Sequence, residues 1–195
     1  MSISFDTTGL QQRDANTWID PPTPDTLLLE QFGVVPDLPA PLEDLATLRA
    51  RLAEIHARNG CLVEAFVIGV DSQPALLRIE KMPLPNQDHG LVFIASIVIP
   101  KADRSIRLMR ICPESGTTGI REAVLMTKIG FQSMFPPHPY APGVKGALPY
   151  NLADDIQYDP EFPDHPLTRA RRWVARIVPT MRLAPDFAGL PPFHR

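Results

Sequence analysis

The chain has 195 residues, of which 44% are hydrophobic and 21% charged, and this is the composition of an ordinary globular domain. Its net charge of −3 gives no general attraction to nucleic acid or anionic lipid, so composition argues against both classes of binding protein. A chain of this length can bury a sufficient core without disulfide bonds. We therefore predict a single domain over 1–195.

The sequence also lacks the usual targeting signals. Met1–Leu10 has neither the basic nor the apolar region of a signal peptide. The longest apolar stretch, Leu91–Pro100, is about half as long as a membrane-spanning helix. Cys61 and Cys112 have no base close by in the sequence, which indicates buried, reduced thiols. We expect a cytoplasmic protein without a membrane span.

Proline divides the chain into a regular middle and irregular ends. There are 23 prolines, more than twice the usual ~5%, and 18 of them lie before residue 45 or after residue 135. Proline fixes φ and removes a backbone donor, so we expect residues 1–41 to form an extended arm that lies against the body. A short helix over Asp25–Phe32 is an alternative within this arm.

The segment 42–135 is predicted to form the core. A first helix over 41–58 carries an apolar stripe and stops at Asn59-Gly60, and the stripe consists of Leu42, Leu45, Leu48, Leu52 and Ile55. Four strands follow, over 61–70, 75–82, 91–99 and 104–112. Because the connections between them are short, they should form an antiparallel meander.

A second helix is predicted over 119–134. Its apolar residues Ile120, Val124, Phe131 and Phe135 are placed to face the sheet, and Pro136-Pro137 ends it. The glycine-rich turn before it, Gly116–Gly119, suits either an anion at the helix N-terminus or a tight strand-to-helix connection. It lacks the lysine of a P-loop.

The rest of the chain is a long loop, a helix and a tail. Residues 136–165 show no helix or strand pattern, and loops of this length tend to be functional or flexible. A third helix is predicted over 166–178, followed by a tail over 179–195. The predicted fold is thus α+β: a four-stranded antiparallel meander sheet packed by about three helices, with proline-rich arms.

Two groups of charged residues suggest binding or bracing. Arg121 and Glu122 either brace neighbouring segments or contact a ligand together with Thr118. An acidic run within 154–164 is followed by arginines on the third helix, which either brace that run or recognise a partner. Arg172 and Arg176 lie one helical turn apart and suit a phosphate or carboxylate.

We predict no catalytic residue, metal site or cofactor. The five histidines are scattered without metal-ligand spacing, and no nucleophile motif is present. Aromatic residues of the long loop are of the type enriched at binding hot spots. The candidate binding residues are Thr118, Arg121, Glu122, Tyr140, Tyr150, Tyr158, Phe162, Arg171, Arg172 and Arg176.

Two segments resemble known sequences. Cys112–Ala123 (CPESGTTGIREA) and Tyr158–Arg169 (YDPEFPDHPLTR) resemble segments of small uncharacterised bacterial proteins. The order of helix, four-strand meander and helix is similar to the PsbP/DcrB-like topology, which implies a loading chaperone or a secretion accessory protein. The proline-rich arms and the 136–165 loop depart from that pattern, and no functional residue carries over.

These observations lead to two functional hypotheses. The first is a non-catalytic bacterial interaction protein, such as a toxin-immunity protein or a secretion adaptor, whose partner is another protein. The second is a small-molecule-binding protein or enzyme with a pocket between the sheet and the 136–165 loop, with Arg121, Glu122 and Thr118 near its floor. The oligomeric state stays open.

Overall fold

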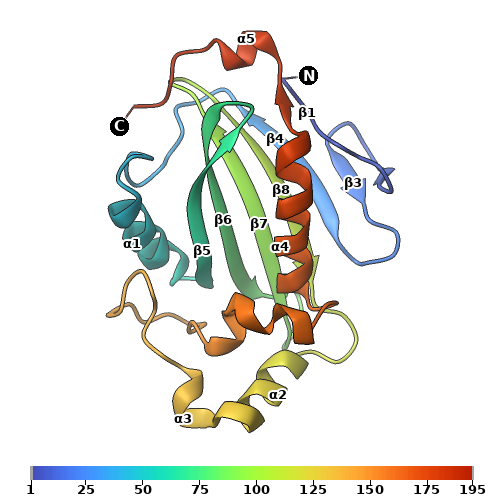
Figure 1. Cartoon of the computed structure of the whole chain (residues 1–195), viewed down its shortest axis with the longest axis vertical. Helices are drawn as coiled ribbons and strands as arrows, with labels where there is room; N and C mark the ends of the chain where they lie inside the picture. The colour runs from blue at the N-terminus through green and yellow to red at the C-terminus, as the bar shows by residue number, and fades with distance from the viewer. Residues whose placement is uncertain (1, 195) are drawn as a thin grey trace.

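A computed structural model describes residues 2–194 (Figure 1). Seven strands join one antiparallel sheet: β2 (Gln11–Gln12), β3 (Thr17–Ile19), β4 (Thr26–Phe32), β5 (Cys61–Val70), β6 (Gln73–Pro83), β7 (Leu91–Pro100) and β8 (Ser105–Pro113). Their order across the sheet is β2-β3-β4-β8-β7-β6-β5. A separate pair is formed by β1 (Ile3–Ser4) and β9 (Arg182–Leu183), which come from the two ends of the chain.

The predicted meander is present as β5 to β8. Each strand pairs with the next in an antiparallel register. The first hairpin is closed by Asp71 and Ser72, which both have positive φ, as a two-residue hairpin turn requires. The strands lie close to their predicted positions because their apolar runs end at turn residues.

The prediction of a four-stranded sheet with about three helices was wrong. The N-terminal arm adds three strands, and β4 pairs with β8 from Thr26↔Ile111 to Phe32↔Ser105. The prolines Pro21, Pro22 and Pro24 do not prevent this, because they lie in the connection that precedes β4. The alternative of a helix over Asp25–Phe32 was also wrong, because Thr26–Phe32 is an inner strand that pairs with β3 and β8.

One face of the sheet is covered by α4 (Pro166–Ile177), which crosses β7 and β8 (Figure 1). Pro166 occupies its first turn, and His165 caps it by accepting a hydrogen bond from the Leu167 amide. Leu167, Ala170, Trp173 and Ile177 are buried against alternate residues of the strands. This is the main hydrophobic core.

The opposite face is covered in part by α1 (Leu45–His56), which packs on β5. Asp44 caps this helix by accepting a hydrogen bond from the Thr47 amide. Leu48 and Leu52 pack on Leu62, Leu76 and other residues in a second core cluster. The predicted apolar stripe is therefore only partly buried, because Ile55 at its end is 47% exposed.

The remaining elements lie at the two ends of the sheet. Below it in Figure 1 are α2 (Ile120–Ile129) and α3 (Phe131–Met134), which divide the predicted second helix at Gly130. The 136–165 segment contains two short 3₁₀ helices, η1 (Leu152–Asp154) and η2 (Ile156–Glu161). The C-terminal segment forms η3 (Val178–Thr180) and α5 (Pro185–Ala188) at the opposite end.

Among residues 2–194, no helix is both long enough and apolar enough to cross a bilayer. Both cysteines are buried and free, as the sequence indicated.

Candidate functional site

A fully buried arginine, Arg121, holds α2 against the acidic segment 154–164. Its guanidinium donates hydrogen bonds to Asp159 Oδ1 (2.9 Å), Thr168 Oγ1 (3.0 Å) and the main-chain oxygen of Asp155 (2.9 Å). A buried charge is tolerated only when it is paired and hydrogen-bonded in this way. The bracing role considered for Arg121 is therefore confirmed.

Arg171 of α4 braces the same acidic segment from its other side. Its Nη1 donates to Asp159 Oδ1 at 2.8 Å, and its Nε donates to Glu64 Oε1 at 2.8 Å. Lys81 adds a buried pair with Asp154, with Nζ and Oδ2 2.6 Å apart. Asp154 and Asp159 of the acidic segment are thus paired within the molecule, as the bracing interpretation of the arginines expected.

Another buried carboxylate, Asp25, connects β8 to α4. Its Oδ2 accepts from Arg110 Nη2 at 2.8 Å, and its Oδ1 accepts from Arg169 Nη2 at 2.7 Å. Burial favours a higher pKa for Asp25, but the hydrogen bonds and charges of Arg169 and Arg110 outweigh it and hold the pKa below the usual range. Asp25 is ionised because both arginines are there.

Beside these ion pairs lies a cavity of about 490 Å³. Its walls come from the turn at 22–24, the connection from β8 to α2, and the segment 162–166. Five charged or ionisable residues contribute to the lining: Glu114, Arg121, Asp164, His165 and Arg169. We call it the β8–α2 cavity.

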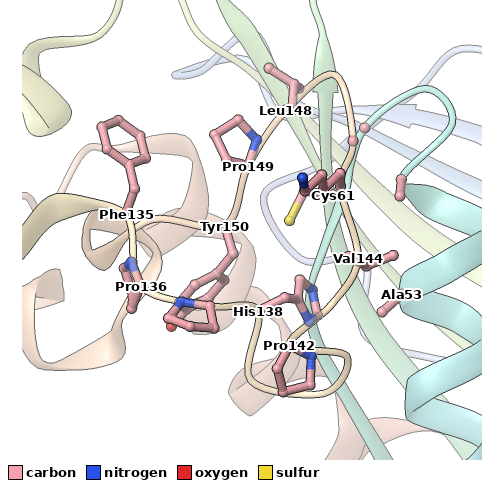
Figure 2. Close-up of a pocket in the computed structure, with 15 residues that line it drawn as sticks. Ala53, Cys61, Phe135, Pro136, His138, Pro142, Val144, Leu148, Pro149 and Tyr150 are labelled. Atoms are coloured by element: carbon pink, nitrogen blue, oxygen red, sulfur yellow. The ribbon is translucent and has the colours of Figure 1, made fainter.

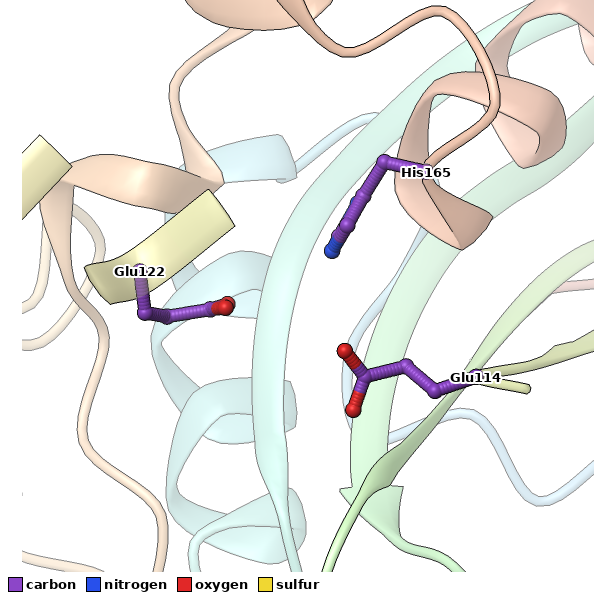
Figure 3. Close-up of side chains that lie close together, drawn as sticks. All are labelled: Glu114, Glu122 and His165. Carbon is purple, nitrogen blue, oxygen red and sulfur yellow. The ribbon is translucent and has the colours of Figure 1, made fainter. Parts of the chain in front are cut away.

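Three ionisable side chains from separate elements converge at this end of the sheet. Glu114 follows β8, Glu122 lies on α2, and His165 caps α4 (Figure 3). One ligand atom of each lies within 4.8 Å of the others. Glu114 is fixed by two amides, since its Oε2 accepts from Leu91 N at 2.8 Å and its Oε1 from Gly119 N at 2.9 Å.

The environment shifts the pKa values of the other two groups toward their neutral forms. Burial raises the pKa of Glu122, and the nearby Glu114 carboxylate raises it further. Burial and the surrounding cationic side chains, with Arg121 the strongest, lower the pKa of His165 to about 3. Shifts of this kind are common at functional sites, although buried ion networks also produce them.

A second, smaller cavity of about 230 Å³ lies between the 135–150 loop and the start of β5. Figure 2 shows the loop curving around it, with Cys61 and His138 beside it and Phe135 pointing away. Tyr150 lines this cavity, and burial raises its pKa to about 12. A pocket between the sheet and the loop was predicted, but Arg121, Glu122 and Thr118 do not line this one.

The other candidate residues are dispersed. Tyr140 is half-buried beneath the Arg49 guanidinium, which lies 4.8 Å from the ring centroid. Tyr158 packs on the small cluster around Leu125, and Phe162 lines the β8–α2 cavity. Thr118 lies in the connection from β8 to α2 and lines neither cavity.

Arg172 and Arg176 are exposed and line a shallow cavity of about 170 Å³ with Arg110, Arg169 and Asp20. Arg172 donates to the main-chain oxygen of Pro163 at 2.9 Å. Their spacing of one helical turn is as predicted, and they lie apart from the Glu114–Glu122–His165 group.

The apolar side chains of α2 and α3 that face solvent were predicted to face the sheet. Ile120, Val124, Phe131 and Phe135 were expected to face the sheet, but they are 51%, 38%, 67% and 40% exposed. We call these four side chains the α2–α3 surface. Ile120 lines the β8–α2 cavity and Phe135 lines the smaller cavity.

These side chains face solvent because of the elements against which α2 packs. The helix lies beyond the end of the sheet, where η1 and α3 are its partners. It turns Arg121 inward to the acidic segment, while Leu125, Met134 and Ala153 form a small core of their own. The acidic segment 154–164 was a signal in the sequence for this arrangement. Its carboxylates can draw Arg121 to the inner face of α2, and the apolar residues then lie on the outer face.

Comparisons of the chain with protein-family models, with curated proteins and with solved structures found no match. The resemblance to small bacterial proteins therefore stays a prediction from two segments.

Proposed function

We propose that this chain is a non-catalytic interaction protein of a bacterial cell that binds another protein through the α2–α3 surface. Toxin neutralisation and an accessory role in secretion are the forms of this function that we favour, with the cytoplasm as the place of action. The observation that carries the proposal is the outward turn of four large apolar side chains on helices whose charged residue Arg121 is fully buried.

The α2–α3 surface has the character of a binding hot spot. At about 200 Å² for a fully exposed aromatic side chain, Phe131 and Phe135 together leave roughly 200 Å² of side chain in water. The two rings pack edge to face, with centroids 5.4 Å apart, so they form a preformed aromatic pair. Large aromatic side chains are among the residue types that carry most of the binding energy at protein interfaces.

The rim of the surface suits a protein partner. Lys128 and Glu161 are about half exposed and form an ion pair beside the apolar residues of α2. A polar, solvent-accessible rim around an apolar centre is the usual anatomy of a protein–protein interface. The cavities at the two ends offer recesses in which side chains of a partner can insert.

The test compares three forms of the tagged full chain as bait in an extract of the native host at physiological salt. The double variant Val124→Glu/Phe131→Glu places two carboxylates on the α2–α3 surface, where their desolvation should abolish binding. The matched control, Val34→Glu/Val35→Glu, changes two residues that are 65% and 63% exposed elsewhere on the chain.

We expect one protein to be retained by the wild type and the control and to be reduced at least about tenfold with the double variant. Equal melting temperatures would verify that all three forms are folded, since the changed side chains are exposed. Retention of the same proteins by all three forms, or of none by the wild type, would contradict the proposal.

A small-molecule-binding function is the alternative, and the β8–α2 cavity is the observation that favours it. Its volume of about 490 Å³ lies in the range of ligand pockets, and it brings Glu114 and His165 to a common wall. A metabolite screen by thermal shift separates the two functions. A specific ligand raises the melting temperature by mass action, whereas a surface adaptor gives no such response.

A further inference from the structure

Two carboxylates lie side by side at the end of the sheet without a cation of their own. Neither Glu114 nor Glu122 forms an ion pair with any side chain of residues 2–194. Glu114 is buried, at 9% exposure. Buried carboxylates are normally paired with a cation or coordinate a metal.

The neighbouring cationic side chains are already committed to other carboxylates. Lys81 pairs with Asp154, Arg121 with Asp159, and Arg169 with Asp25. None of these three cations forms an ion pair with Glu114 or Glu122.

Two buried atoms of the group also lack a hydrogen-bond partner. Glu122 Oε2 and His165 Nε2 are both shielded from solvent, and neither has a partner among the described residues. The side chains of Glu122 and His165 point toward the space that they share with Glu114 (Figure 3). Unsatisfied buried polar atoms are rare, and two that converge on one point indicate a ligand that satisfies both.

The geometry suits a single ion. For three atoms within 4.8 Å of one another, some point lies within about 2.8 Å of all three (4.8 Å divided by √3). Ligand distances to zinc are about 2.0–2.2 Å for imidazole nitrogen and carboxylate oxygen, so closing requires each side chain to move by less than about 1 Å. Glu114 is already held by the amides of Leu91 and Gly119, the kind of support that orients metal ligands.

We propose that Glu114, Glu122 and His165 form a binding site for a divalent transition-metal ion of the Zn²⁺ or Mn²⁺ class. One imidazole and two carboxylates match the ligand preferences of these ions, whereas Mg²⁺ and Ca²⁺ favour oxygen ligands alone. Glu114 and His165 both line the β8–α2 cavity, which gives the ion access from solvent and leaves coordination positions for a further ligand.

Metal binding has one structural consequence for α4. His165 Nδ1 now accepts a hydrogen bond from the Leu167 amide at 3.2 Å, which places the ring proton on Nε2. Coordination through Nε2 moves that proton to Nδ1 and releases the amide. The loss is small, because a 3.2 Å hydrogen bond is at the long end of the range and Pro166 still fixes the first turn.

The test is titration of the chelator-treated full chain with Zn²⁺, Mn²⁺ and Mg²⁺ by calorimetry. We expect one Zn²⁺ per chain, weaker binding of Mn²⁺, and a rise in melting temperature on loading. Glu122→Gln and His165→Asn should each weaken Zn²⁺ binding at least about tenfold. Asparagine at 165 retains an oxygen that caps the helix, so this variant removes the ligand and not the cap.

Two controls keep the result interpretable. Glu161→Gln changes an exposed carboxylate outside the group and should leave Zn²⁺ binding unchanged. Without metal, Glu122→Gln should melt at or above the wild-type temperature, because it removes a buried carboxylate that has no cation. The proposal is overturned if the wild type binds neither Zn²⁺ nor Mn²⁺, or if Glu122→Gln and His165→Asn bind Zn²⁺ as the wild type does.

Discussion

At the scale of single residues, the molecule is organised by buried charges that come in complementary sets. Asp25 has a side chain that is 0% exposed and is clamped by Arg110 and Arg169, which come from β8 and α4. Arg121 is the opposite case, a buried cation that donates hydrogen bonds to three oxygen acceptors. Such groups contribute little net stability as complete sets but cost a great deal when one member is removed.

Replacing Asp25 with asparagine tests this arrangement. The variant leaves the buried Arg110 with Asp20 as its one carboxylate and takes from the part-buried Arg169 its ion-pair partner, so the free energy of unfolding in urea should fall by about 3 kcal/mol. Asp103→Asn breaks an exposed pair with Arg104 and should leave the free energy of unfolding essentially unchanged. If the two variants were equally stable, Asp25 would not have the structural role described above.

His138 should make stability depend on pH. Its Nε2 lies 2.9 Å from the Leu62 main-chain oxygen, and its Nδ1 accepts from the Tyr140 amide at 3.1 Å, so only the neutral ring makes both bonds. Burial lowers its pKa from the ordinary value. The unfolded chain therefore binds the proton more readily, and the contribution of His138 is present above about pH 6.5 and is lost as the pH falls through the folded pKa.

The measurement is urea unfolding at about pH 7.5 and about pH 5.5 for the wild type and for His138→Gln. The unfolding free energy of the wild type should fall between these pH values, and that of the variant should fall less. The difference is limited to about 1.4 kcal/mol per pH unit, the value for one proton. Identical pH dependence in the two proteins would show that His138 does not contribute.

At the scale of elements, the 136–165 segment is held to the helices by close backbone approach. A Cβ on Gly146 would lie 2.6 Å from the main-chain oxygen of Ala57, just after α1. Gly143 of the same segment has nothing within 4 Å of such an atom. The two glycines thus make a matched pair within one loop.

Gly146→Ala should lower the free energy of unfolding by about 1–3 kcal/mol, because the backbone must move to admit the methyl group. Gly143→Ala should stay within about 0.5 kcal/mol of the wild type. Limited proteolysis gives a second measurement, since only the first variant should expose the loop to cleavage. Equal effects of the two substitutions would mean that the loop is not docked on α1.

Elements with a clear repeating pattern could be predicted from the sequence, and those defined by long-range partners could not. The meander and α4 follow from apolar runs that end at turns or prolines. The strand β4 was missed because prolines on either side suggested an irregular arm, although Thr26–Phe32 itself contains none. The apolar residues of α2 were assigned to its inner face, because the spacing of residues along a helix does not show that Arg121 has buried oxygen partners.

Single residues of the candidate site were predicted from the sequence, but the group that they form was not. Arg121, Glu122 and Arg171 were singled out from sequence, and the structure gives each a defined environment. The Glu114–Glu122–His165 group was not foreseen, because its members are 8 and 43 residues apart and meet only through the packing of β8, α2 and α4. Ligands that come from distant segments leave no spacing signature.

At the scale of the whole molecule, the sheet separates the chain ends from the α2–α3 surface. The strands β1 and β9 pair near the two termini, at the end of the sheet away from α2 and α3 (Figure 1). The helices α1 and α4 pack on the two faces of the sheet. The helices α2 and α3 are therefore free to present apolar side chains outward, and a tag on either terminus lies far from them.

Site-specific photo-crosslinking in the native host gives the sharpest comparison of surfaces. A photoreactive phenylalanine analogue at position 131 should crosslink the chain to one partner protein as a product that contains one copy of each. The same analogue in place of Phe32, which is 37% exposed on β4, should give no such product. Equal products from positions 131 and 32, or none from position 131, would contradict a binding role for the α2–α3 surface.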